Sequence, residues 1–375
     1  MMVRLCSAAA LLAAATVSAL TLSSCGGGPD LQDWPAPPEP TLGLPDGAAL
    51  GNTDLDPQPG DSGGAPWGSL RPDDATADQR VPDIVGRGRL IVGVSQSTNG
   101  LGYRDPVTGD MAGFEVDIAH EIARDIFGDP GRVDFRYIEG GDRESALRDG
   151  DVDIVVRTMT VTRARQAGVE FSTPYLRTSP RILVPRDSGV TGVDDLADRT
   201  VCVTRGSTNA QEVYADVPHR QVLATRTWPD CLMAMQRGQA DATYSDAAIL
   251  SGLQAQDPNT ELVSPRGTGS TGGTGGSVDY AVATAPETVR DTAPLVRQIN
   301  TTLERLRTDG TWDRLYSRWL APYLGPDTPP DAVYRDDRGS ADLDRYRREA
   351  AASSAPSAPS APSAPSAPTT EARPR

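Results

Sequence analysis

One pattern occurs twice in this chain and constrains its fold more than any other feature. It is a helix-forming stretch that ends near a glycine and an aspartate and runs directly into a strand-forming stretch. The first copy is Ala146–Asp153 followed by Ile154–Val156, and the second is Ala234–Asp241 followed by Ala242–Tyr244. Glycine suits the left-handed position that commonly follows the last turn of a helix. The repeat therefore predicts two lobes of similar α/β design, and a cleft between two lobes is a common place for a small-molecule site.

Residues 1–25 have the features of a bacterial lipoprotein signal peptide. An early charge at Arg4 precedes the apolar run Leu5–Leu22, and Leu22-Ser23-Ser24-Cys25 is followed by three glycines. The run is too short, and too soon followed by glycine and proline, for a good membrane-spanning helix. The alternative is an ordinary secretory peptide with a chance cysteine at its end. We expect an exported chain, held on the extracytoplasmic face of the cell membrane by acyl groups such as palmitate on Cys25.

The remaining cysteines agree with export. Of the four cysteines, one leaves with the signal peptide and Cys25 takes the lipid, so Cys202 and Cys231 remain. Outside the cytoplasm, two such cysteines most simply form a disulfide. The only histidines, His120 and His219, do not have metal-ligand spacing to these cysteines. We therefore expect neither a metal nor a cofactor.

The charge balance excludes one class of partner. The chain has 51 acidic and 36 basic residues, for a formal net charge of −15. Phosphate binding needs a basic surface, so this balance argues against nucleic acid. Every basic residue is arginine, so lysine-based chemistry is also excluded.

The two flanks of the chain differ from its middle. Residues 26–80 are rich in proline, glycine and aspartate and lack periodicity, which predicts a disordered tether. Residues 326–375 end in a Ser-Ala-Pro repeat and are interpreted as a low-complexity tail. The middle is long enough for two small lobes. We assign residues 81–180 and 278–325 to lobe 1 and residues 181–277 to lobe 2.

Strands and helices alternate along this middle part. The alternation predicts an α/β fold with mostly parallel sheets and a ligand at the carboxyl ends of the strands. Two crossings between the lobes are expected, near Pro180–Val184 and Ser277–Ala281. The predicted strands include residues 89–94, 133–137, 153–157, 181–184, 200–203 and 279–284, and the predicted helices include 113–127, 143–148, 289–308 and 311–320.

An ordered set of short motifs then points to a family. The motifs are Gly93-Val94, Asp105–Gly109, Gly113–Asp117, Met159–Arg165, Phe171–Tyr175, Asp195-Leu196, Arg205–Thr208, Gly238–Ala242, Asp246–Leu250 and Gly310–Trp312. In this order they resemble the family 3 (polar amino acid) extracellular solute-binding proteins of ABC importers. Gly100–Gly102, Thr158–Thr160 and the paired cysteines are similar to actinobacterial glutamate-binding lipoproteins. The resemblance implies a two-lobed, type 2 periplasmic-binding-protein-like fold with two hinge crossings.

The resemblance also implies a function. It predicts a monomeric, lipid-anchored receptor that binds an acidic amino acid, glutamate or aspartate, and delivers it to the membrane permease of an ABC importer. One alternative is a sensor that signals through a membrane partner to a protein kinase. A less favoured one is an enzyme similar to cyclohexadienyl dehydratases, with Glu115 or Glu139 as general acid. The sequence has no paired carboxylates, Ser-His-Asp set or metal cluster to support catalysis. The third alternative is a structural protein that acts as a spacer at the cell wall.

An amino acid buried between lobes needs a cation for its carboxylate and acceptors for its ammonium. Arg165 matches the arginine that grips the carboxylate in the resembled family, although it could be a surface arginine instead. Ser207 and Thr208 open a helix, with Thr208 at the start of a capping box, and its free amides suit the same carboxylate. Asp246 would neutralise the ammonium, or serve only as a helix cap. Thr160 would add its hydroxyl group to the acceptors around the ammonium.

Selectivity depends on the residues around this clamp. Thr158 stands where the family usually has glycine, and its carbonyl would join the ammonium shell. Arg143 aligns with an arginine that meets the distal carboxylate in acidic-amino-acid binders, although it could be a helix-surface residue. Arg157 is another candidate cation. Leu101 replaces a phenylalanine that stacks on the ligand in many relatives, which disfavours glutamine, arginine and histidine.

Overall fold

The computed structural model describes residues 43–51, 64–265 and 276–354. The predicted signal peptide, Cys25 and the Ser-Ala-Pro repeat lie outside the described residues. None of the helices within these ranges is both long and apolar enough to cross a membrane.

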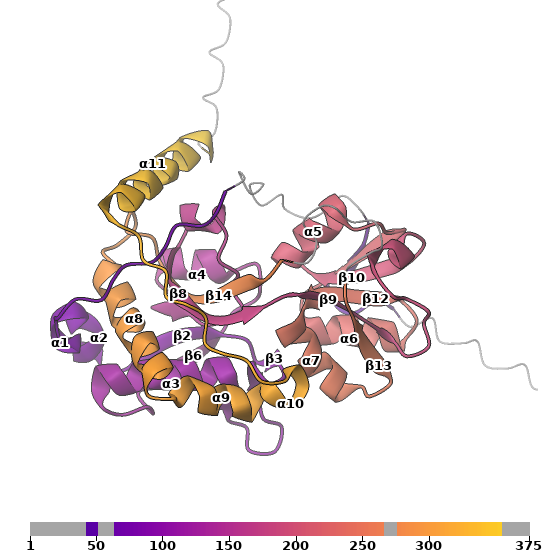
Figure 1. Ribbon diagram of the computed structural model, residues 1–375, viewed down its shortest axis with the longest axis horizontal. Coiled ribbons are helices and arrows are strands. Elements are labelled where there is room, and N and C mark those ends of the chain that lie inside the picture. Colours follow the sequence, from indigo (N-terminus) through magenta and orange to yellow (C-terminus); the bar gives the residue numbers. More distant parts are fainter. Residues whose placement is uncertain (1–42, 52–63, 266–275, 355–375) are drawn as a thin grey trace, which may run out of the picture. The chain divides into compact units, whose positions relative to one another are not determined.

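The first lobe is built on a five-stranded sheet (Figure 1). Its helix α3 (Phe114–Phe127) matches the expected helix to within one residue, and Phe114, Ile118 and Ile122 are fully buried at the spacing of one helix face. The sheet order is β6 (Val133–Tyr137), β2 (Leu90–Val94), β7 (Ile154–Val155), β14 (Val278–Thr284) and β8 (Glu170–Thr178). The helices are α1 (Ala77–Arg80), α2 (Pro82–Arg87), α3 (Phe114–Phe127), α4 (Arg143–Asp149), α8 (Ala293–Thr308), α9 (Thr311–Trp319) and α10 (Ala321–Leu324), with the 3₁₀ helix η2 (Arg165–Ala167). A small sheet joins β3 (Ser97–Thr98), β4 (Gly102–Arg104) and β5 (Met111–Ala112).

The second lobe is built on a six-stranded sheet. Its order is β1 (Ala49–Leu50), β11 (Gln221–Thr225), β10 (Thr200–Thr204), β12 (Ala242–Asp246), β9 (Pro180–Pro185) and β13 (Thr260–Val263). The helices are α5 (Thr208–Asp216), α6 (Trp228–Gln236) and α7 (Ala247–Gln256), with the 3₁₀ helix η3 (Val193–Leu196). A disulfide joins Cys202 in β10 to Cys231 in α6, with Cα atoms 5.6 Å apart. Both cysteines are fully buried, so the bond ties helix to strand inside the lobe.

Both sheets are mixed, and the expectation of mostly parallel sheets is wrong. Each has three adjacent parallel strands, β6-β2-β7 and β11-β10-β12. The strands on either side of the crossings pair antiparallel, β9 with β12 and β14 with β7 and β8. The first crossing is at Ser179, just before the predicted segment, because β8 ends at Thr178 and β9 begins at Pro180. The return crossing lies between β13 and β14.

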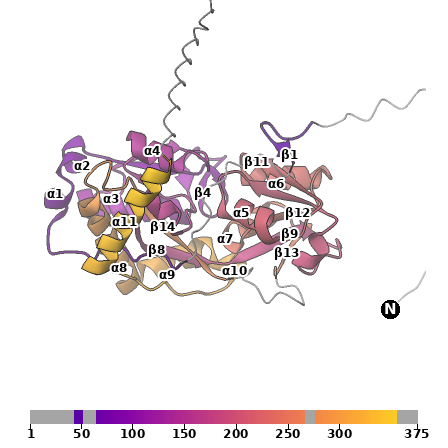
Figure 2. The ribbon, with the colours of Figure 1, turned by 90° about the horizontal axis from the view of Figure 1, so that it is seen from above.

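Parts of the predicted tether and tail are folded, which corrects both assignments. Residues 64–71 and 333–354, which we call the terminal clasp, pack together on lobe 1 (Figure 2). An isolated β-bridge pairs Ser69 with Tyr334, and helix α11 (Asp337–Ser354) lies against η2. The carboxylate of Glu170, 1% exposed, binds two clasp guanidinium groups from Arg335 and Arg347 at 2.7 and 2.8 Å. These contacts join residues that are far apart in sequence, so the periodicity of either segment does not predict them.

Candidate functional site

The structure brings all seven predicted ligand residues to one small cavity between the lobes. Arg143, Thr158, Thr160 and Arg165 come from lobe 1, and Ser207, Thr208 and Asp246 come from lobe 2. On the lobe 1 side they follow β6 and β7, and on the lobe 2 side they follow β10 and β12. The site therefore lies at the carboxyl ends of the parallel strands, as the α/β pattern predicted.

Arg165 is held at the start of η2 with its guanidinium facing the other lobe. Its backbone amide donates to Thr162 Oγ1 at 3.1 Å, which fixes the turn that leads into η2. Nη1 donates to Thr160 O at 3.0 Å, and Nη2 donates to Gly206 O of lobe 2 at 3.2 Å. Burial, and secondly the charge of Arg143, lowers the pKa of Arg165 to about 9. A buried carboxylate would remove both penalties.

Arg143 is also buried, but its donors are already occupied by backbone carbonyls. Nε donates to Gly140 O at 2.8 Å, and Nη2 donates to Gly206 O at 2.9 Å across the cleft. Nη1 lies 3.2 Å from the carbonyl of Arg157 and 3.3 Å from that of Thr158. It is therefore not a helix-surface residue. Contact between Arg143 and a distal ligand carboxylate stays a prediction.

The start of α5 differs by one residue from the predicted cap. Ser207, not Thr208, is the N-cap, because its Oγ accepts from Ala210 N at 3.0 Å and donates to Thr204 O at 2.7 Å. Thr208 is the first helical residue, and its hydroxyl lies 3.4 Å from that of Thr160. The two lobes therefore meet at this pair of threonines.

Asp246 precedes α7, yet its side chain does not cap that helix. One carboxylate oxygen accepts from Asn209 Nδ2 at 3.0 Å, and the other accepts from the hydroxyl of Tyr280 in β14. Its exposed fraction is 2%, and burial raises the pKa of its carboxyl. Asp246 therefore occupies the N-cap position of α7, as one of the two alternatives had it, but its side chain is engaged in the cleft and makes no capping hydrogen bond. A neighbouring ammonium would favour the ionised carboxylate.

Thr158 has a backbone conformation that glycine adopts more readily, and glycine is the residue that the family resemblance implied at this position. Its φ of +40° lies in the left-handed region, which is costly for a β-branched residue. Its amide donates to Glu115 Oε1 at 2.5 Å, and Tyr175 donates to the same oxygen at 2.5 Å. Burial raises the pKa of Glu115. This buried carboxyl group thus supports the loop that carries the site.

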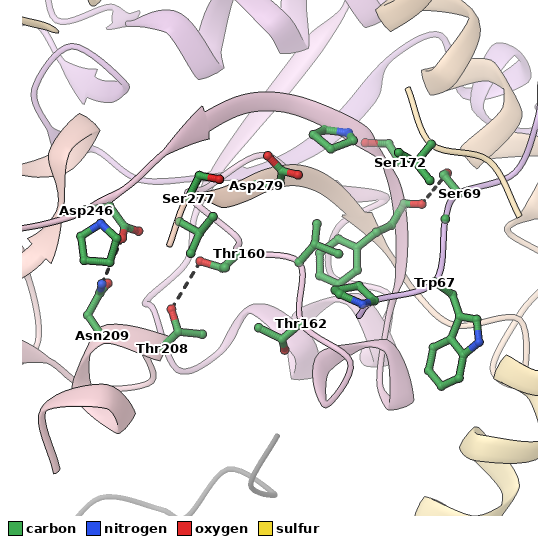
Figure 3. Close-up of a pocket in the computed structure, with 18 of the residues that line it drawn as sticks. Trp67, Ser69, Thr160, Thr162, Ser172, Thr208, Asn209, Asp246, Ser277 and Asp279 are labelled. Atoms are coloured by element: carbon green, nitrogen blue, oxygen red, sulfur yellow. Dashed lines mark hydrogen bonds between the residues drawn. The ribbon is translucent and has the colours of Figure 1, made fainter. Parts of the chain in front are cut away.

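A wider cavity of about 390 Å³ adjoins the arginine-lined one, and Thr160, Thr208, Asn209 and Asp246 line both. Figure 3 shows Asn209 turned toward Asp246, and Thr160 toward Thr208. Trp67 of the terminal clasp forms part of the far wall.

Three supporting residues escaped the sequence analysis. Asn209 and Tyr280 hold Asp246, and Trp67 lines the wider cavity. Asn209 directly follows the Arg205–Thr208 motif, and a tryptophan in a Pro- and Gly-rich segment was a signal of packing. Leu101 lies fully buried in the core and lines neither cavity, so its expected place beside the ligand is wrong. Leu101 therefore gives no reason to disfavour glutamine, arginine or histidine as ligands.

The chain was compared with known protein families. A model of the bacterial extracellular solute-binding proteins, family 3, matches residues 90–322. This chain belongs to that family. Family 3 proteins are receptors for solutes and not enzymes, so the dehydratase alternative with Glu115 or Glu139 is excluded.

Several relatives of this family 3 protein have the names of amino-acid-binding proteins. The glutamine-binding protein GlnH of an ABC transporter of Bacillus subtilis is 30% identical over 62% of this chain and 81% of its own. The glutamate-binding protein GluB of Corynebacterium glutamicum is 30% identical over 66% of this chain and 85% of its own. By name, both relatives bind an amino acid, and GlnH belongs to an ABC transporter.

Solved structures agree on the two-lobed fold of this family 3 protein. The solute receptor for L-cysteine of Neisseria gonorrhoeae has a TM-score of 0.59 at 25% identity and covers 70% of this chain and 100% of its own. An ancestral arginine-binding protein bound to arginine has a TM-score of 0.53 at 28% identity, over 62% of this chain and 99% of its own. The names of these relatives span different amino acids, so selectivity has to be argued from this chain's own site.

Proposed function

We propose that this protein is a lipid-anchored extracytoplasmic receptor that closes on an acidic amino acid, glutamate or aspartate, for an ABC importer. One observation carries the proposal. Four arginines line the cavity, and three of them, Arg143, Arg157 and Arg165, are each no more than 7% exposed and form no ion pair with any described residue. Buried cations without a counter-charge are costly, and an anionic ligand offsets that cost.

The α-carboxylate would lie between Arg165 and the start of α5. Nη2 of Arg143 and Nη2 of Arg165 both donate to Gly206 O in the cleft. A carboxylate accepts such charge-assisted bonds more strongly than a carbonyl does. The backbone amides at Thr208 and its neighbours, at the N-terminus of α5, suit the same negative group.

The ammonium group would lie beside Asp246. This carboxyl is held by Asn209 and Tyr280, and it is the acidic side chain that lines both cavities. Thr160, and the carbonyl of Thr158, would complete the acceptors, as the resemblance implies. A cation site at Asp246 opposite an anion site at Arg165 matches the two ends of a zwitterion.

A calorimetric titration of the soluble protein tests this function. The panel is glutamate, aspartate, glutamine, asparagine and arginine, with the chain from residue 43 onward as the sample. We expect the acidic amino acids to bind at least about tenfold more tightly than their amides, since each tenfold corresponds to about 1.4 kcal/mol. Tighter binding of an amide or of arginine would overturn the acidic selectivity. No binding of any of the five would overturn the receptor itself.

Closure of the lobes gives a second prediction, at Gly206. Its φ is +68°, and an added Cβ would lie 2.8 Å from Gly141 Cα on the opposite lobe. We expect Gly206→Ala to hold the lobes apart and to weaken ligand binding by tenfold or more in the same titration. Gly238→Ala is the matched control, since Gly238 has φ of +66° and nothing within 4 Å of an added Cβ. The control should lose about 1 kcal/mol of stability through left-handed strain and keep its affinity. Equal affinities in the two variants would contradict this account of closure.

Transport remains the proposed role, and signalling is the alternative. Both require the same closed receptor, which presents a different surface from the open one. The lipid anchor on Cys25, the monomeric state and the identity of the membrane partner are part of the proposal.

A further inference from the structure

Arg157 differs from the other two buried arginines of the cavity, Arg143 and Arg165, in how its donors are used. Arg143 makes four hydrogen bonds to backbone carbonyls, and Arg165 makes two. The side chain of Arg157 makes none to the residues that the structure describes, and its buried Nε lacks any partner. A guanidinium has five N–H donors, so an unpaired buried one is expensive.

The carboxylates nearest to Arg157 are committed elsewhere. Glu139 forms its ion pair with Arg226 at the rim of the cleft. Glu115 accepts from Tyr175 and from the amide of Thr158. Neither lies within ion-pair distance of Arg157, although both act on it through space. The charge of Arg143 adds repulsion, and together with burial it lowers the pKa of Arg157 to about 10.

The backbone around Arg157 holds the side chain in this place. The carbonyls of Arg157 and Thr158 both accept hydrogen bonds from Arg143 Nη1. Arg143 is the first residue of α4, so this helix fixes the segment that follows β7. Arg157 Nη1 lies against Gly140, 3.2 Å from where a Cβ on that glycine would be. A larger residue at 140 would crowd this guanidinium. These contacts therefore hold Arg157 in the wall of the cavity.

We infer that Arg157 binds the second, side-chain carboxylate of the ligand and sets the preference for acidic over neutral amino acids. This inference rests on the proposed function and names the residue that selects its substrate class. Arg165 takes the α-carboxylate, and Arg143 acts as a positioning residue through the carbonyls of Arg157 and Thr158. An amide ligand brings no charge to Arg157, so the buried guanidinium stays uncompensated and binding is weaker.

Arg157→Met tests the inference, because methionine removes the charge and donors but keeps an unbranched side chain. Calorimetric dissociation constants for glutamate and glutamine are measured on the wild-type protein and on this variant. We expect the glutamate affinity to fall at least about 100-fold and the glutamine affinity to change by less than about fivefold or to improve. Arg186→Met is the control for lost charge, since Arg186 is exposed on lobe 2 and donates to Pro258 O. It should preserve both affinities.

The outcomes separate this inference from the proposed function. If the wild-type protein prefers glutamate and Arg157→Met keeps that preference, the assignment of Arg157 is wrong and the receptor function stands. If the wild-type protein binds glutamine more tightly, the acidic function itself is wrong. Retained glutamine binding by Arg157→Met shows that the variant is folded. Should it not fold, Arg157→Lys keeps the charge on a single donor head, and we expect an intermediate loss of glutamate affinity. An unchanged glutamate-to-glutamine ratio in that variant would equally overturn the inference.

Discussion

Replacing Arg165 with alanine is expected to remove detectable amino-acid binding while leaving the protein folded. A buried carboxylate that loses a charged partner loses about 2–5 kcal/mol of binding free energy, which is roughly 30- to 5000-fold in affinity. The free energy of unfolding should change by less than about 1 kcal/mol, because Arg165 forms no ion pair with any residue that the structure describes and is repelled by Arg143. Thermal unfolding should therefore shift by only a few degrees.

A lysine variant at position 165 distinguishes a contribution that needs only the positive charge from one that needs the bidentate guanidinium group. Arg165→Lys keeps the cation and loses the planar fork, so we expect affinity between those of the wild-type and alanine proteins. Calorimetric titration with glutamate and a thermal melt are made on all three. Wild-type affinity in Arg165→Ala would mean that the α-carboxylate is held elsewhere.

Replacing Glu170 with glutamine is expected to be the most destabilising change outside the cavity. The carboxylate of Glu170 accepts from Arg335 Nη1 at 2.7 Å and from Arg347 Nη2 at 2.8 Å. Both arginine side chains are no more than 4% exposed. Removing its charge leaves two buried cations without a counter-charge, at a cost of about 3–5 kcal/mol in the free energy of unfolding. Denaturant unfolding measures the loss.

The effect should begin in the terminal clasp. Arg347 also donates to Gln166 O and Val169 O, next to η2, so release of α11 exposes the segment that begins with Arg165. Limited proteolysis should cut Glu170→Gln within residues 326–354 before the lobes. Asp342→Asn is the control, because the Asp342 and Arg345 pair on the same helix is largely exposed and worth less than about 1 kcal/mol. If both variants unfold alike, the buried pair does not hold the clasp.

Local patterns predicted most helices and strands of the two lobes. Strand β6 has the expected bounds, helix α3 matches the expected helix to within one residue, and the glycines at 150 and 238 adopt the left-handed conformation expected after a helix. These signals work because periodicity and turn chemistry act within one element. Helix α8 begins at Ala293 and not at 289; Thr292 is its N-cap and Pro294 lies in its first turn, where the missing N–H of proline is tolerated.

The candidate site was only partly readable from sequence. The seven residues converge on one cavity, as the motif order implied, but their roles as ligands remain predictions. The choice of Arg157 over Arg143 needed the hydrogen-bond partners of each guanidinium. The cap at Ser207, the burial of Leu101 and the engagement of Asp246 with Tyr280 likewise depend on neighbours outside the local segment.

The sequence by itself determined the alternation of elements, the α/β class and the family, because these depend on local propensity and on motifs in order. Tertiary structure alone decided the antiparallel strands at the crossings, the terminal clasp and the arginine that lacks a partner. Glu170 and Arg347 are 177 residues apart. Pairing of buried charges over such a separation is set by which surfaces meet, and that information is not carried by the periodicity of either segment.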